Sequence, residues 1–302
     1  MPSTPIAPDR IAQNQIARDQ IARDQIAYDR FGHGASVVLL HPTGLGPAVL
    51  VPFAERLAAT HDVVVPHRRG YGRSAALDPA RTLDDHVDDL AALLDDLAGA
   101  GPPAPVTLVG ISAGATICLA YAARARTPAV RFLAHEPLFG PLSPSLHARV
   151  TGRIDRLIAR ADQPLELSLF ISELIGLPTW NALPAAWRTG VEQNRAAALA
   201  EVGFYAAFAL GDGELIQIGR RGFTTTVGAR SSEARHEAAD ILRAHGIGVV
   251  QLPDCAHLAP FDAPSAFADA VDLVQGQELP APTDDGSGAA QGVTSLDVGA
   301  PR

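Results

Sequence analysis

One pentapeptide, Gly110-Ile111-Ser112-Ala113-Gly114, constrains the fold more than any other stretch of this chain. The residues before it, 106–109, are apolar and mostly β-branched, which is typical of a strand buried on both faces of a parallel sheet. The residues after it, Ala113 to Arg126, read as a helix. A strand that turns at once into a helix strains the backbone, and a glycine on either side of the serine removes the clashes of a Cβ. We therefore expect Ser112 to lie exposed over the free N–H groups of a helix, where a nucleophile and an oxyanion are stabilised.

The composition excludes several classes of function. The chain has 302 residues and a net charge of −9, and its 24 basic residues are all arginine. The absence of lysine excludes Schiff-base chemistry and a lysine-type phosphate loop, and the acidic balance argues against nucleic acid as a partner. Two cysteines, Cys118 and Cys255, are too few for a disulfide framework. Without an apolar run of membrane length or the layout of a signal peptide, we expect a cytoplasmic protein with no membrane partner.

The two ends of the chain differ in composition from the rest. A five-residue repeat begins at Ile11 and recurs at Ile16, Ile21 and Ile26. A period of five matches neither a helix nor a strand, so we expect residues 1–25 to form a weakly ordered N-terminal tail. Residues 276–302 are rich in Gly, Pro, Ser, Asp and Ala without periodicity, which predicts a disordered C-terminal tail.

Between the tails, short apolar runs alternate with amphipathic stretches. We expect strands within residues 31–34, 36–40, 62–66, 106–109, 130–135, 223–228 and 249–252, the first of them in a hairpin. We expect helices over residues 47–60, 83–97, 113–126, 233–245 and 263–275. This alternation predicts the α/β class, with a doubly wound, mostly parallel sheet whose ligands gather at the C-terminal ends of the strands.

The alternation stops over residues 140–220, and this interruption predicts an inserted helical lid. The core is then formed by residues 26–139 and 221–275. We expect three or four helices in the lid, with breaks at Gly152, Pro164, Pro178 and Pro184.

Two sets of lid residues invite a functional interpretation. The first set is the large apolar residues of the lid, of which most would be core and a minority would line a pocket. The whole set is Phe139, Leu142, Leu167, Phe170, Leu174, Trp180, Trp187, Phe204, Tyr205 and Phe208. Four arginines at helical spacing share one helix face, which we interpret as a solvated face in preference to an anion-binding stripe; they are Arg149, Arg153, Arg156 and Arg160.

Four segments in this order resemble the α/β-hydrolase superfamily, and the resemblance covers residues 26 to 275. They are Leu40-His41-Pro42-Thr43-Gly44, similar to the oxyanion strand end; Arg69-Gly70-Tyr71-Gly72-Arg73-Ser74, similar to the Arg-Gly-x-Gly-x-Ser loop; the pentapeptide around Ser112, similar to the nucleophile elbow; and Asp254-Cys255-Ala256-His257 with Pro264 and Phe267, similar to the closing histidine loop.

The resemblance implies a role for four of these residues. Ser112 would be the nucleophile, and His257 the base that takes its proton and later protonates the leaving group. The backbone N–H groups of Thr43 and Ala113 would form the oxyanion hole. Two further histidines, His41 and His135, fall near the same edge of the sheet and could line the pocket.

The third member of the triad departs from the family pattern. Where the family usually has its acid, after the strand that follows the lid, this chain has Ser231. Glu233 could reach the base from the same loop, or could instead cap the helix that begins there. Glu136 directly follows the strand after the elbow, and an unpaired carboxylate there would be costly to bury. We prefer Glu136 as the acid and keep Glu233, or no acid, as alternatives.

A serine at the elbow argues against haloalkane dehalogenases and epoxide hydrolases, which in this superfamily need a carboxylate there. We therefore expect a serine hydrolase that acts on a small carboxylic ester or lactone through an acyl-enzyme, with no cofactor and no metal. Two alternatives stay open, namely a non-hydrolytic small-molecule binder and a biosynthetic enzyme that uses the same site for cyclisation or C–C cleavage.

Overall fold

The computed structural model describes residues 25–80, 82–99, 104–124, 129–137 and 144–279. The expected N-terminal tail lies outside the described residues except for residue 25, and the expected C-terminal tail lies outside them except for residues 276–279.

The described residues form one seven-stranded sheet. Its strands are β1 (Tyr28–Gly32), β2 (Ala35–Leu40), β3 (His61–Pro66), β4 (Val106–Ile111), β5 (Val130–His135), β6 (Thr224–Gly228) and β7 (Gly248–Leu252). Their spatial order is β1-β3-β2-β4-β5-β6-β7, and only the pairing of β1 with β3 is antiparallel. The doubly wound, mostly parallel sheet that the alternation predicts is thus confirmed.

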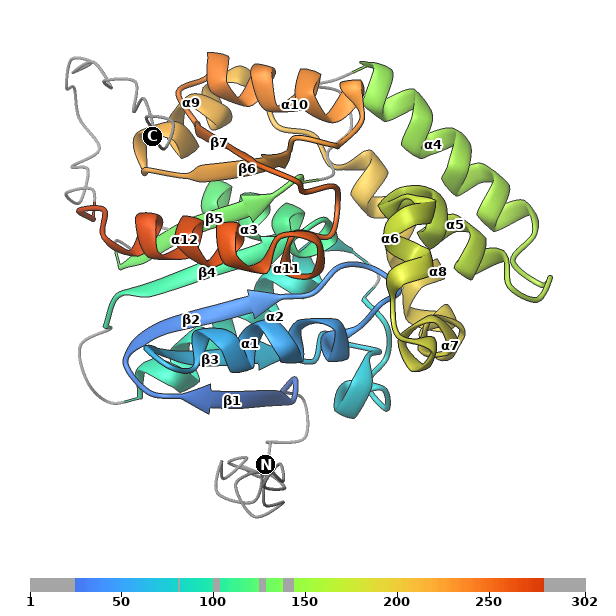
Figure 1. The fold of residues 1–302 in the computed structure, drawn as a ribbon, viewed down its shortest axis with the longest axis horizontal. Helices are drawn as coiled ribbons and strands as arrows, with labels where there is room; N and C mark the ends of the chain where they lie inside the picture. Colours follow the sequence, from blue (N-terminus) through green and yellow to red (C-terminus); the bar gives the residue numbers. More distant parts are fainter. Residues whose placement is uncertain (1–24, 81, 100–103, 125–128, 138–143, 280–302) are drawn as a thin grey trace, which may run out of the picture.

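Helices cover both faces of the sheet and one of its ends. Those of the core are α1 (Val51–Leu57), α2 (Leu83–Ala98), α3 (Ala113–Arg124), α10 (Glu233–Ala244), α11 (Ala259–Asp262) and α12 (Pro264–Gln275), with short 3₁₀ helices at Pro47–Leu50 and Gly72–Ser74. In Figure 1, α1 and α12 lie in front of the sheet, whereas α2 and α3 lie behind it. Within the described segments, no helix combines the length and the apolarity that a membrane span requires.

The first strand differs from the predicted hairpin. β1 does not pair with β2, which follows it directly, because β3 lies between the two. The chain crosses the end of β3 through Gly32 and Gly34, both of which have a positive φ. A Cβ on either glycine would meet the backbone of residues 58–61 at 2.3–2.4 Å, so the crossover requires both.

Between β5 and β6 the described chain forms six helices, and our expectation of three or four is wrong. They are α4 (Pro144–Ala159), α5 (Glu166–Ile175), α6 (Leu177–Ala182), α7 (Ala185–Gln193), α8 (Arg195–Ala207) and α9 (Asp212–Arg220). Gly152 does not break α4, since a glycine costs a helix only about 1 kcal/mol, which packing can override. Pro178 lies in the first turn of α6, where proline needs no N–H partner.

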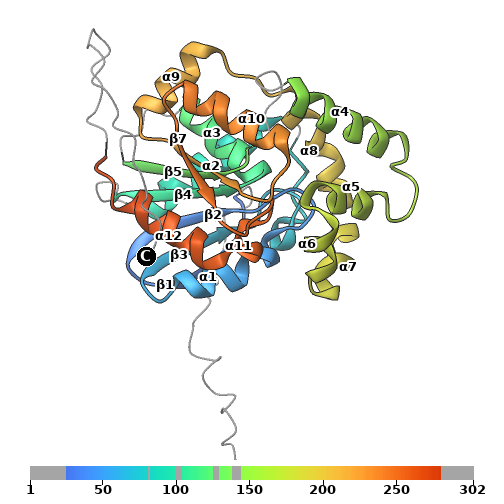
Figure 2. The ribbon, with the colours of Figure 1, turned by 45° about the horizontal axis from the view of Figure 1, so that its top comes forward.

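The helices of residues 144–220 lie in two places. Figure 2 shows α4 to α8 gathered at one end of the sheet, whereas α9 returns to the body of the molecule. There α9 packs against α3 of the core. The end that α4 to α8 cover is the one where the parallel strands finish, and therefore where ligands of such sheets gather.

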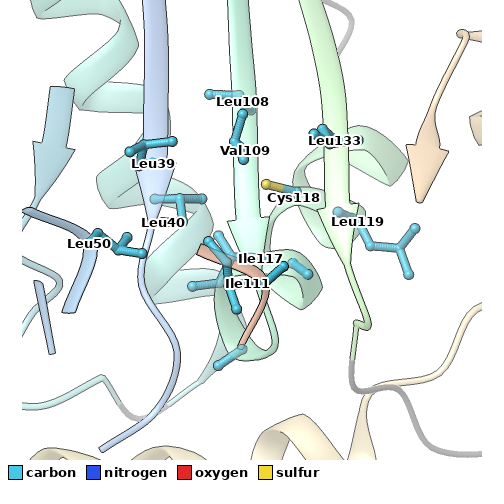
Figure 3. Packing of buried hydrophobic residues seen from close by; sticks show 14 of the residues in the cluster. Leu39, Leu40, Leu50, Leu108, Val109, Ile111, Ile117, Cys118, Leu119 and Leu133 are labelled. Carbon is cyan, nitrogen blue, oxygen red and sulfur yellow. The ribbon is translucent and has the colours of Figure 1, made fainter. Parts of the chain in front are cut away.

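The core is a continuous apolar layer between the central strands and α3. Leu39, Val109 and Leu133, from three neighbouring strands, are fully buried, and Cys118 and Leu119 of α3 lie among them (Figure 3). Both cysteines are free and buried. Nearly every residue of α3 between Ala113 and Ala122 is inaccessible to solvent, which fixes the helix that begins at Ser112 against the sheet.

The two glycines of the elbow are required by close backbone contacts, as the sequence predicts. A Cβ on Gly110 would lie 2.3 Å from the carbonyl oxygen of Gly114, and a Cβ on Gly114 would lie 2.2 Å from that of Leu40. Both obstacles are backbone atoms, which cannot rotate away. The elbow therefore holds β2, β4 and the start of α3 at a distance that only glycine allows.

We predict that Gly114→Ala lowers the free energy of unfolding by about 1–3 kcal/mol or more, because the added methyl group overlaps the Leu40 carbonyl. The matched control is Gly152→Ala in α4, where a Cβ meets nothing within 4 Å and should stabilise the helix by about 1 kcal/mol. Urea unfolding of both variants measures the difference. Equal midpoints would show that the elbow tolerates a side chain.

Candidate active site

Ser112 lies between β4 and α3 with a backbone φ of 55°. A positive φ is uncommon for a residue with a side chain and is held here by the surrounding structure. The Ser112 N–H donates to the carbonyl of His135 at 2.9 Å, which ties the turn to the end of β5. Ser112 is only 3% exposed, so the expectation of an exposed serine is wrong. The helices α5 to α8 lie beyond this end of the sheet in Figure 1.

Glu136 is the first residue after β5 and is the second strained position, with a φ of 49°. Its carboxylate is buried and has two donors at each oxygen. Oε2 accepts from His257 Nδ1 at 2.7 Å and from Arg235 Nε at 3.1 Å. Oε1 accepts from the Gly228 N–H at 2.9 Å and from the Ser231 hydroxyl. Glu136, and not Glu233 on α10, is therefore the carboxylate that contacts His257.

These partners keep the Glu136 carboxylate ionised. Burial by itself would raise the pKa of this group, but the positive charge of Arg235 and the contacts with His135 and His257 bring its pKa far below the usual range. Arg235 is only 7% exposed, so Arg235 and Glu136 have both lost their hydration and are stabilised by the ion pair between them.

His257 follows β7 in the loop that leads to α11, and it is neutral at neutral pH. Burial lowers its pKa, Arg235 lowers it further and Glu136 opposes them, which leaves the pKa at about 4. The hydrogen-bond network assigns the proton to Nδ1, which donates to Glu136. The other nitrogen, Nε2, then has a free lone pair and can accept a proton.

In this structure His257 Nε2 contacts an arginine and not the serine. Arg235 Nη2 lies 3.2 Å from His257 Nε2. Among the described residues, no hydrogen bond joins the Ser112 hydroxyl to His257. The two residues lie at the ends of β4 and β7, on the same edge of the sheet.

Two backbone N–H groups near Ser112 have no acceptor within the described part of the chain: those of Thr43 and Ala113. Ala113 is the first residue of α3, where N–H groups have no helical partner. The Thr43 hydroxyl is also buried without a hydrogen-bond partner in that part of the chain, and an unpaired buried polar group of this kind is costly unless a ligand or water satisfies it.

The loop that carries Thr43 is held from both sides. The Gly44 N–H donates to the Tyr71 hydroxyl at 3.2 Å, and the Gly44 carbonyl accepts from Asn194 Nδ2 at 2.8 Å. Tyr71 in turn donates to Glu201 of α8, whose carboxylate forms a fully buried ion pair with Arg68 at 2.5 Å. A buried charge on α8 therefore fixes the position of the loop that carries Thr43.

A cavity of about 430 Å³ lies beside His257, under α4, α5 and α6. Ser231, Arg235 and His257 form its floor, and Phe261 and Leu174 supply apolar wall. A volume of this size suits a small ligand. Ser112 does not line this cavity.

Several expected pocket residues are placed elsewhere. His41 and His135 are buried and do not line the cavity, since His41 bonds to Pro42 and His135 to Thr226 and Ala256. Phe139 and Leu142 lie outside the described residues. Phe170, Leu167 and Tyr205 are core of the lid, as expected for most of that set.

The arginine face of α4 is mostly exposed to solvent, as expected, but its N-terminal part also borders the cavity. Arg149 and Arg153 line the cavity beside His257. Arg156 and Arg160 are exposed and pair with Glu173 and Glu166 respectively.

His135, Glu136 and His257 could in principle gather around a cation, because their ligand atoms lie within 4.8 Å of one another. Each of these atoms already has a protein partner, and the Arg235 guanidinium lies against the same carboxylate oxygen as His257. The geometry therefore favours a hydrogen-bonded carboxylate–histidine pair over a metal site.

Sequence reasoning missed two residues of this site. Arg235 lies in the first turn of α10, where an arginine is ordinarily a surface residue, and nothing in its neighbours indicates burial. Ser231 was identified only as a missing acid, yet its hydroxyl contacts Glu136 from that position. The sequence offered a signal for this contact, because a serine hydroxyl at the usual position of the acid can donate to a carboxylate from another strand.

Comparison with known proteins finds one family and many similar folds. Residues 37–270 match the model of the alpha/beta hydrolase family. A thermophilic esterase from Thermogutta terrifontis is 22% identical, with a TM-score of 0.63, and the match covers 82% of this chain and 92% of that one. An enol-lactonase from Burkholderia xenovorans is 18% identical, with a TM-score of 0.63 and coverages of 83% and 96%. A carboxylesterase from Bacillus subtilis is 15% identical, with a TM-score of 0.66 and coverages of 85% and 90%. At these identities the likeness to the three structures shows the fold. A search of curated proteins found no match.

We predict that His257 titrates near pH 4, because burial and Arg235 disfavour its charged form. As the pH falls from about 6.5 to 4, the unfolded chain then takes up this proton before the folded one, so acidification lowers the free energy of unfolding across that window. NMR of the imidazole C–H groups, with His257→Asn to assign the resonance, measures the midpoint. A midpoint at 6.5 or above would contradict the buried pairing with Arg235.

Proposed function

The chain belongs to the α/β-hydrolase family, and on that premise we propose that it is a serine hydrolase that cleaves a small carboxylic ester or lactone. The observation that carries the proposal is the 2.7 Å hydrogen bond between Glu136 and His257 Nδ1, both buried at the end of the sheet where Ser112 ends β4. A carboxylate at Nδ1 orients the ring and holds its proton there, so that Nε2, which Arg235 Nη2 contacts at 3.2 Å, is the unprotonated nitrogen that can act as a base.

In the proposed reaction, Ser112 Oγ attacks the carbonyl carbon of the substrate and its proton passes to His257 Nε2. The tetrahedral oxyanion accepts hydrogen bonds from the N–H groups of Thr43 and Ala113, which have no acceptor within the described residues. Collapse expels the alcohol, which takes the proton from His257 and leaves an acyl group on Ser112. Water then attacks the ester carbon with His257 as its base, releasing the acid and restoring the serine.

The low pKa of His257 keeps the ring neutral at neutral pH, although it also makes the ring a weaker base than a free imidazole. At neutral pH the ring is almost entirely in the form that accepts a proton. The imidazolium that forms during the reaction is stabilised by Glu136, which stays ionised because its own pKa is depressed. In this role Arg235 is a positioning residue, since it holds the Glu136 carboxylate and lies against Nε2.

The size of the cavity supports a small substrate. A volume of about 430 Å³ matches a compact acyl or lactone group. Proteins of the same fold include an esterase, a carboxylesterase and an enol-lactonase, which is consistent with this class of substrate.

We predict that Ser112→Ala lowers kcat for a chromogenic short-chain ester by roughly 10⁴-fold or more, because the nucleophile is lost. Release of 4-nitrophenolate measures the rate. A fluorophosphonate probe should label the unaltered protein and fail to label the variant. Labelling that is absent from both would overturn the proposal and favour a non-hydrolytic binder on the same fold.

The role of Glu136 has its own test. Glu136→Gln should lower kcat by roughly 10³- to 10⁴-fold, because a neutral amide does not stabilise the imidazolium and misplaces the proton on the ring. Glu233→Gln, on the exposed first turn of α10, is the matched control and should retain activity. Circular dichroism checks that Glu136→Gln is folded, since it leaves the buried Arg235 unpaired. A loss of activity only in the Glu233 variant would show that Glu233, and not Glu136, is the acid partner of His257.

A further inference from the structure

The cavity beside His257 has an unusual charge. Four arginines line it, Arg149 and Arg153 from α4, Arg230 from the loop after β6, and Arg235 from α10. The protein as a whole carries a net charge of −9, so this concentration of positive charge is opposite to the general composition. Local charge of one sign at a concave site attracts ligands of the other sign.

Arg149 and Arg153 of α4 provide positive charge that is not fully balanced by a nearby carboxylate. Their positions differ by four, so both side chains project from one face of the helix, and Figures 1 and 2 show the N-terminal half of α4 against α10. Arg149 forms no hydrogen bond or ion pair with any described residue. Arg153 pairs with Glu173 at 3.3 Å, but Glu173 is shared with Arg156 at 2.9 Å, so one carboxylate serves two guanidinium groups.

The acids that line the cavity do not neutralise it. Besides Glu173, the lining includes Asp262, whose carboxylate accepts from Thr179 Oγ1 at 2.8 Å and from the Ala256 N–H at 3.1 Å. Asp262 is thus held by the loop that carries His257 and contacts none of the arginines. Glu136, which balances Arg235, lies behind it and outside the lining.

Arg235 joins this positive surface to the base. Its guanidinium lies in the cavity floor and contacts both Glu136 and His257. Burial lowers the pKa of Arg235, Glu136 opposes that effect, and the nearby charge of Arg153 lowers the pKa further. Two guanidinium groups that repel each other across a cavity leave a favourable position for an anion between them.

We propose that this cavity is a subsite for a carboxylate of the substrate, so that the natural ester or lactone is an anion. Arg149 and Arg153 bind the carboxylate, and Arg235 faces it from the floor beside His257. The planar guanidinium forks suit a carboxylate, which they can bind through paired hydrogen bonds. The apolar wall of Leu174 and Phe261 accommodates the short carbon chain between the carboxylate and the scissile bond. This inference rests on the proposed serine hydrolase function and narrows its substrate class.

The kinetic test compares charged and neutral esters of equal length. Mono-4-nitrophenyl esters of glutaric and adipic acid retain a free carboxylate, and their methyl-capped analogues do not. After subtraction of the uncatalysed rate, we expect kcat/KM to favour the charged ester by about 10- to 100-fold, the range of a charge-assisted contact. Arg149→Gln with Arg153→Gln should abolish most of this preference. Arg160→Gln, on the same helix but outside the cavity, is the matched control and should retain it.

A binding test separates this inference from the proposed function. Calorimetry with succinate on Ser112→Ala protein should detect binding that the Arg149→Gln/Arg153→Gln changes weaken at least 10-fold, and inorganic phosphate serves as the comparison anion. If the fluorophosphonate probe labels Ser112 but charged and neutral esters react equally, the subsite is refuted while the hydrolase proposal stands. If the probe does not label, calorimetry alone decides, and an absence of succinate binding overturns the subsite. Binding of phosphate without succinate would overturn the choice of a carboxylate.

Discussion

The buried charge of Glu136 is the interaction on which the geometry of this site depends. A carboxylate without water is stable only if donors surround it, and here each donor comes from a different part of the chain. His257 arrives from the loop after β7, Arg235 from α10, and the Gly228 N–H and the Ser231 hydroxyl from the end of β6. Displacing any of these elements would leave part of the charge unsatisfied. The requirement to satisfy one anion therefore determines where the histidine lies.

A second buried carboxylate performs a comparable task on the other side of Ser112. Glu201 extends from the lid helix α8 and forms an ion pair with Arg68, which follows β3. The same carboxylate accepts from Tyr71, and Tyr71 in turn accepts from the Gly44 N–H, next to Thr43. Each network joins a helix outside the sheet to a loop at the edge of the sheet: α10 to the loop of His257, and α8 to the loop of Thr43. The packing of α8 on the core and the placement of the loop that carries Thr43 therefore depend on each other, since displacing α8 would leave the buried Arg68 without its carboxylate.

The sequence could predict those features that depend on residues close together in the chain, and not those that depend on how distant elements pack. The parallel strands, the strand–turn–helix around Ser112 and the need for its two glycines depend on neighbouring residues, and these predictions are confirmed, whereas the hairpin expected at the first strand is wrong. Glu136 could be preferred over Glu233 because a carboxylate on a buried strand end demands a partner. Arg235 could not be predicted, since its burial depends on where α10 packs against β6, β7 and α4, which no local pattern encodes. Helical spacing likewise predicted a largely exposed face of α4, but not that Arg149 and Arg153 on that face line the cavity, because spacing defines a face and not what the face meets.

Arg235 links the two functions that this edge of the sheet combines. Its charge stabilises ionised Glu136, yet it also opposes the imidazolium that must form on His257 beside it. An isolated arginine in this position would therefore help to orient the base and hinder its protonation. A carboxylate in the cavity would offset that repulsion just as the positive charge develops on the ring, because the anion would face Arg235 and Arg153 from the opposite side. The charge of the substrate would then contribute to the basicity of His257 as well as to binding, and a neutral ester would lack both contributions.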